Sequence, residues 1–221
     1  MFFEIVNVEE NPTALEEIKR LGVMGAPAVV IGDRAFYGWN PKKLAAFVEV
    51  EYVEPEHLSW AELIERLDRI LAAAQRAISQ VPNERLDRAT PGRNRTVRNL
   101  GFHLFRLGFA FFDAMEQKHL PKEWLSEEAP PELKDGEGIA QYGQKIRDHL
   151  KKWSGADAPE GIVMTYYAPQ TTHELLERIA WHIAQHLRQL YSLLEQMGIT
   201  PIHPLKGEDF KGLPLPKEVW G

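Results

Sequence analysis

The sequence contains no cysteine among its 221 residues. This absence excludes disulfide bonds, thiolate metal ligands and catalysis by a thiol of the chain itself. Basic residues are fewer than acidic residues, and the formal net charge is −6. Because proteins that bind nucleic acids usually carry a basic surface, we expect no nucleic-acid partner.

Long apolar runs are also missing. No run approaches the roughly 20 residues that a membrane-spanning helix needs, and the N-terminus lacks the basic and apolar regions of a signal peptide. We therefore expect a cytoplasmic protein with no membrane partner. Hydrophobic residues still make up 44% of the sequence, which is enough for a sizeable core.

The first part of the chain, residues 1–52, alternates short β-rich and helical patterns. Residues 2–8 (FFEIVNV) are β-branched and aromatic, which predicts a strand. The whole part is predicted as β-α-β-β-α, with strands at 2–8, 28–31 and 35–39 and helices at 12–21 and 40–50.

The second part, residues 53–199, changes to long amphipathic patterns. Ser59 with Glu62 and Thr171 with Glu174 form capping-box patterns at two helix starts. Four helices are predicted, at about 59–81, 96–118, 138–153 and 171–197. The connections around the third helix are long, so the pattern predicts a mostly α fold, namely a four-helix bundle with long crossover connections.

The last part, residues 200–221, holds four prolines and shows no helical period. It is predicted to be a tail or an extended wrap.

Three histidines stand where a helical core would normally have Leu or Ile. On the predicted fourth helix, steps of three and four residues define one apolar stripe: Leu175, Ile179, His182, His186, Leu190, Leu193 and Met197. On the second helix, Leu100, His103, Leu107 and Phe111 follow the same spacing. Both stripes should face the core of the bundle.

This arrangement is typical of a metal site. Two histidines four residues apart project from one helix face, and His103 from a facing helix completes a set of three. Three protein ligands leave one position for water or substrate, as in catalytic zinc sites. The nitrogen ligands predict a divalent ion, zinc first, with Ni, Mn or Fe as alternatives.

The alternative is that these histidines are hydrogen-bonded core residues without a metal. The five other histidines, His57, His119, His149, His173 and His203, are expected at the surface or at helix caps. Arg106, Gln185 and Gln189 flank the three ligands as candidate outer groups, although each taken singly is expected to be an ordinary exposed helix residue.

Residues 58–198 resemble the DinB family of metal-binding four-helix bundles. The stretches that carry the resemblance are RTVRNLGFHLFRL (95–107) and LLERIAWHIAQHLRQL (175–190). Members of this family usually bind a divalent metal through one histidine on the second helix and an H-x-x-x-H pair on the fourth. The resemblance thus implies a metal held by His103, His182 and His186.

Some DinB-like proteins are S-transferases that use low-molecular-weight bacterial thiols, and family members often dimerise. The resemblance therefore implies a metal-dependent thiol S-transferase, a small-molecule thiol or electrophile as partner, and a homodimer. The enzyme interpretation also predicts an open coordination position that faces a pocket of drug-like size. The alternative is a non-catalytic binding or interaction module with a structural or vestigial metal site. No residue is assigned a catalytic role.

The N-terminal part resembles the second half of a glutaredoxin or thioredoxin-like fold through GVMGAPAVVIGDRAFYGWNPKKL (22–44). The half with the C-x-x-C motif is missing, so redox activity of this unit is excluded. The resemblance implies a cis bond before Pro27. We expect strands 2–8 and 28–31 to pair directly in a three-stranded sheet; the alternative is that another chain completes the sheet.

Overall fold

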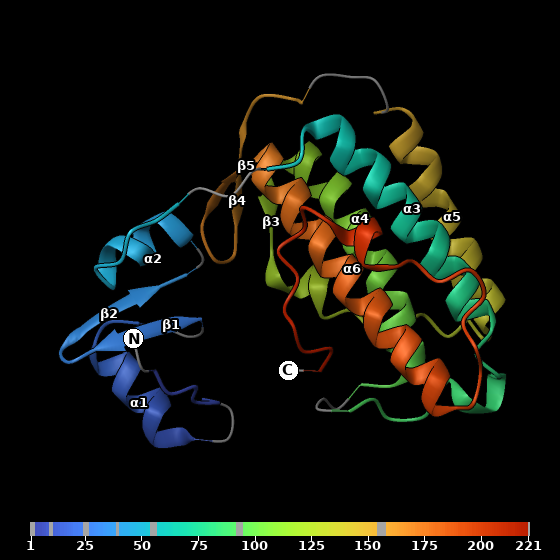
Figure 1. Ribbon diagram of the computed structural model, residues 1–221, viewed down its shortest axis with the longest axis horizontal. Coiled ribbons are helices and arrows are strands. Elements are labelled where there is room, and N and C mark those ends of the chain that lie inside the picture. Colours follow the sequence, from blue (N-terminus) through green and yellow to red (C-terminus); the bar gives the residue numbers. More distant parts are fainter. Residues whose placement is uncertain are drawn as a thin grey trace. The chain divides into compact units, whose positions relative to one another are not determined.

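The computed structural model describes residues 3–8, 11–23, 27–38, 40–53, 57–91, 95–153 and 158–220. The chain divides into two compact units, residues 1–56 and 57–221. Most of the regular structure is helical (Figure 1), so the mostly α class predicted from the sequence is confirmed.

The first unit contains two short helices and a hairpin. The helices are α1 (Pro12–Arg20) and α2 (Pro41–Phe47), and the strands are β1 (Ala28–Ile31) and β2 (Arg34–Tyr37). The asparagine before each helix caps it: Asn11 accepts a hydrogen bond from the backbone N–H of Ala14, and Asn40 from that of Lys43. The strands are antiparallel, and Gly32 turns between them with a φ of 61°.

The predicted strand at 2–8 is wrong over the residues that the structure describes. Residues 3–8 form no strand, and the side chains of Phe3 and Ile5 are 80% and 86% exposed. Over its described residues, the sheet of this unit has two strands, not the expected three. β-branched and aromatic residues favour a strand only where a neighbouring strand can pair with them. The bond before Pro27 involves Ala26, which lies outside the described residues.

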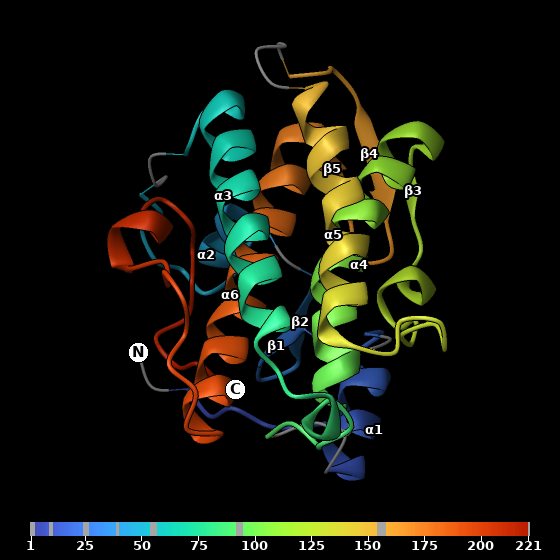
Figure 2. The same cartoon turned by 90° about the vertical axis from the view of Figure 1, so that its right-hand side faces the viewer.

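The second unit is built on four long helices that lie side by side (Figures 1 and 2). They are α3 (Trp60–Ser79), α4 (Val97–Gln117), α5 (Gly136–Lys151) and α6 (Thr172–Gln196). Each predicted helix end lies within two residues of the observed end. α3 and α4 each pack against both α5 and α6, and the buried faces meet in one hydrophobic core.

The helix starts explain why these segments are helical. Ser59 and Thr171 each form the predicted capping box, with Glu62 and Glu174 respectively. Thr96 caps α4 by accepting a hydrogen bond from the backbone N–H of Asn99. These caps set where α4 and α6 begin, and the apolar stripe of each helix determines which residues face the core.

A second, three-stranded sheet lies in the connections between the helices. β3 (His119–Leu120) follows α4, while β4 (Ile162–Thr165) and β5 (Pro169–Thr171) precede α6. β4 pairs in parallel with β3 and antiparallel with β5. The extended segment predicted at 163–167 corresponds to β4 and the turn after it.

The C-terminal residues 200–220 wrap along the second unit. Of the two predicted forms, a tail or an extended wrap, they adopt the wrap. They contain the short 3₁₀ helix η3 (Gly207–Phe210), and Leu213 is buried in the core. The Arg66 guanidinium on α3 holds the wrap by donating to three of its carbonyl oxygens, those of Glu208, Asp209 and Lys211. Among the described helices, none has the length and apolar character needed to cross a bilayer.

Gly136 provides a test of how closely α3 and α5 approach. A Cβ at this position would fall on the carbonyl oxygen of Ile78, which is backbone and cannot rotate away. We expect Gly136→Ala to lower the free energy of unfolding by about 1–3 kcal/mol, the usual cost of overpacking, measured by urea denaturation. Gly207→Ala is the control, because nothing lies within 4 Å of its Cβ position. Equal effects of the two substitutions would contradict this packing.

Candidate metal centre

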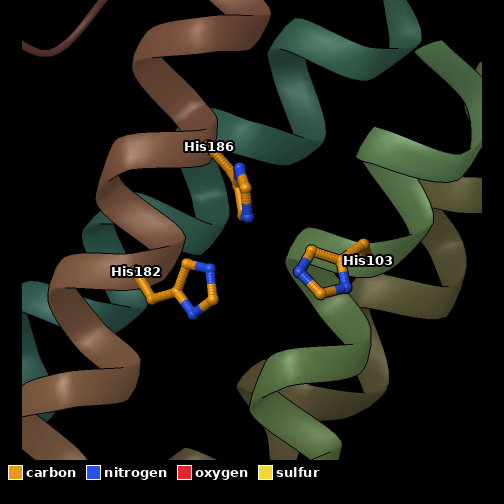
Figure 3. A group of neighbouring side chains, drawn as sticks. All are labelled: His103, His182 and His186. Carbon is orange, nitrogen blue, oxygen red and sulfur yellow. The ribbon is translucent and has the colours of Figure 1, made fainter. Parts of the chain in front are cut away.

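The three histidines predicted as ligands meet between α4 and α6. Figure 3 shows the ring of His103 on α4 facing the rings of His182 and His186 on α6. The ring centroid of His103 lies 5.7 Å from that of His182 and 4.9 Å from that of His186. The centroids of His182 and His186 are 4.7 Å apart. The helix spacing read from the sequence therefore brings all three rings together.

The nitrogens of these rings are close enough to serve one ion. One ring nitrogen from each histidine lies within 4.8 Å of the other two. A tetrahedral zinc ion about 2.0–2.1 Å from each nitrogen requires separations of about 3.4 Å. Small ring rotations can supply that difference, so the residues present fit a divalent ion. Among the described residues, the cluster contains no carboxylate and no fourth histidine.

Core packing explains why these rings face one another. On α6, the stripe partners Leu175, Ile179 and Leu190 are at most 2% exposed. On α4, Leu100 and Leu107, which flank His103, are also at most 2% exposed. Burial of these neighbours orients the two stripes toward each other. The histidines lie on the same stripes, so they also face each other.

Burial also affects the protonation state of His182. His103 and His186 are each 5% exposed, and His182 is partly buried. Desolvation lowers the pKa of His182 well below its ordinary value, and the neighbouring His186 and His103 lower it further. His182 is therefore neutral at pH 7, and neutral imidazole is the form that binds a metal.

Gln189 holds His186 in a defined orientation. The His186 Nδ1 lies 2.7 Å from the Oε1 of Gln189, while the Nε2 of Gln189 donates to the carbonyl oxygen of Val219 at 3.0 Å. Because a carbonyl oxygen only accepts, the amide of Gln189 must turn its NH₂ toward Val219 and its oxygen toward His186. His186 therefore carries its proton on Nδ1, which leaves Nε2 as the nitrogen that could bind an ion.

The other two candidate outer groups are engaged elsewhere. Arg106 donates to Glu127 at 2.7 Å and to Asp113 at 3.2 Å. Gln185 donates to the carbonyl oxygens of Glu218 and Val219. The expectation that each is an ordinary exposed residue is wrong, since Arg106 and Gln185 are each 8% exposed.

Two α6 residues that sequence reasoning did not single out flank His182. The indole of Trp181 stacks on the His182 ring at 5.5 Å, and the Arg178 guanidinium lies 4.1 Å over the Tyr167 ring. Arg178 precedes His182 by four residues, so the helical period could have identified it. Trp220, which lies near His186, had no such signal because it is distant in sequence.

The space beside His186 is small. It holds about 10 Å³, room for about one water molecule. It is lined by Thr90, Pro91, Arg95, Leu100, His186, Gln189 and Trp220. It is therefore far smaller than the drug-sized pocket expected for an enzyme. A larger hollow of about 620 Å³ lies between α3 and α5, and none of the three histidines lines it.

The five remaining histidines do not join the metal-compatible cluster in the part of the chain that the structure describes. His57 pairs with Glu177, His173 bonds to the carbonyl oxygen of Leu58, and His149 bonds to that of Lys145. His119 and His203 are exposed. Their predicted surface and capping positions are consistent with these contacts.

Ligand removal tests the site through stability. At free zinc 100 times above the dissociation constant, binding stabilises the folded protein by about 2.7 kcal/mol. We expect zinc to raise the melting temperature of the natural protein, EDTA to reverse the rise, and His186→Gln to abolish it. His119→Gln, which changes an exposed histidine, should leave the zinc effect intact. An undiminished zinc shift in His186→Gln would rule out this residue as a ligand.

In comparisons with known proteins, no family model matches the chain, and no curated protein or solved structure matches it significantly. The geometry of the histidines therefore carries the functional argument, and the resemblance to DinB-like bundles stays a prediction.

Proposed function

We propose that the protein binds one divalent metal ion through His103, His182 and His186, with zinc as the first candidate and Ni, Mn or Fe as alternatives. The observation that carries this proposal is the convergence of three imidazole nitrogens to within 4.8 Å of one another. Imidazole suits all of these ions. The arrangement also fits a DinB-like four-helix bundle, which places its ligands on the second and fourth helices.

The charge of the ligand set indicates what the fourth ligand is. Three neutral imidazoles leave the charge of a divalent ion uncompensated, and the cluster of described residues includes no carboxylate. An anionic fourth ligand is therefore favoured. An ion held in this way acts as a Lewis acid that favours the ionised form of a coordinated thiol or water.

A thiol S-transferase is the enzymatic form of this proposal. The chain has no cysteine, so the thiol must come from a low-molecular-weight substrate. Among the described residues, the cluster includes no carboxylate that could serve as a general base for hydrolysis, which favours a thiol over water. The choice of this reaction rests on the DinB resemblance. Dimerisation and a cytoplasmic location likewise stay predictions.

A non-catalytic metal-binding module is the second candidate. The observation that favours it is the space beside His186, which has room for about one water molecule. In that form the histidines would hold an ion for stability or assembly, and no substrate would reach it.

Metal content is the first test. We expect untagged protein, purified without added metal, to contain about one divalent ion per chain by elemental analysis, because three converging ligands give high affinity. His103→Gln should lose most of this ion, while His119→Gln should retain it. Natural protein that carries no stoichiometric ion and takes up none from added zinc would refute the proposal.

Thiol binding separates the two candidates. Protein loaded with Co²⁺ would be titrated with L-cysteine and followed by absorption. We expect a thiolate-to-cobalt charge-transfer band if the fourth position accepts a thiol. A cobalt spectrum that is unaffected by L-cysteine would instead support the non-catalytic module. The His182→Gln variant is the control, since it should weaken both cobalt loading and the band.

A further inference from the structure

The C-terminal segment 216–220 runs alongside α6 (Figure 1), where side chains of the helix bind its backbone. Arg188 donates to the carbonyl oxygens of Pro216 and Lys217, and Gln185 donates to those of Glu218 and Val219. Every carbonyl from residue 216 to 219 therefore accepts a hydrogen bond from α6.

One of these contacts continues to the metal ligand His186. The carbonyl oxygen of Val219 accepts from the Nε2 of Gln189 at 3.0 Å, and the Oε1 of Gln189 accepts from the Nδ1 of His186 at 2.7 Å. Gln185 donates to the same Val219 oxygen at 2.7 Å. A backbone carbonyl near the end of the chain thus determines which way the amide of Gln189 points.

Trp220 anchors the end of this segment. Its indole Nε1 donates to the hydroxyl of Ser192 at 3.2 Å, and its ring packs against the hydrophobic core. The same residue lines the small space beside His186, together with Gln189. The segment therefore holds Gln189 in place and covers one side of the histidine cluster.

We propose that Gln189 is a positioning residue of the metal centre and that residues 216–220 belong to the centre because they orient it. This inference rests on the proposed metal-binding function. Gln189 accepts the Nδ1 proton of His186, which directs Nε2 toward the ion. Outer partners of this kind usually change metal affinity by 10–100-fold when they are removed.

Substitutions at Gln189 separate positioning from packing. We expect Gln189→Leu, which keeps the size of the side chain but removes the acceptor, to weaken zinc affinity by about 10–100-fold, measured by competition with a chelator. Gln189→Glu keeps an acceptor for the Nδ1 proton but can no longer donate to Val219, so its affinity should fall by less than that of Gln189→Leu. Weakening of equal size in both variants would overturn the positioning role.

The contribution of the segment is tested by a chain that ends at residue 215, which keeps Leu213 and Leu215 in the core. We expect this truncation to weaken zinc affinity, and Gln189→Leu in the truncated chain to bind no more weakly than Gln189→Leu alone. Such non-additivity shows that both changes act through the same contact. Additive losses, or no loss on truncation, would overturn the role of the segment.

Two further measurements distinguish a failure of the proposed function from a failure of this inference. Gln141→Ala removes an exposed amide from α5, which carries none of the three histidines, and should leave zinc affinity unchanged. Nitrogen-15 NMR of the metal-free protein should show the Nδ1-protonated form of His186, and a mixture of forms in Gln189→Leu. If the natural protein binds no zinc, the proposed function fails; if it binds zinc and Gln189→Leu binds equally well, only this inference fails.

Discussion

The burial of three imidazole rings between α4 and α6 is the constraint on which the site depends. A polar ring in an apolar core costs free energy unless hydrogen bonds or a metal compensate it. The structure provides part of that compensation through the 2.7 Å contact between His186 and Gln189. Desolvation also lowers the pKa of His182, so that no positive charge has to be buried there. A divalent ion would supply the partner that the converging ring nitrogens share.

The packing of the remaining helices maintains this convergence. α3 and α5 both contact the helices that carry the three histidines, and the leucines next to His103 are buried with it. The caps at Thr96 and Thr171 set where the two helices that carry the histidines begin. Local sequence signals and tertiary packing thus both help to bring the three histidine rings together.

Features that depend on local sequence could be predicted, and those that depend on distant partners could not. The helical period places His103, His182 and His186 on core-facing stripes, and their convergence followed once α4 and α6 packed together. Residues 2–8 have the composition of a strand, but the described residues 3–8 have no neighbouring strand. The carbonyl oxygen of Val219 has no sequence signal at all, because every residue has the same backbone group. The contact between Val219 and Gln189 could therefore be identified only from the structure.

The surroundings of His186 and His182 differ. His186 is 5% exposed and faces the small space that Trp220 lines. His182 is the least buried of the three histidines, and Trp181 stacks on its ring. Arg178 and Arg95 are close enough to lower the pKa of His182 further, after the effects of burial and of the other two histidines. Arg95 also lines the space beside His186, so its positive charge lies close to both His182 and His186.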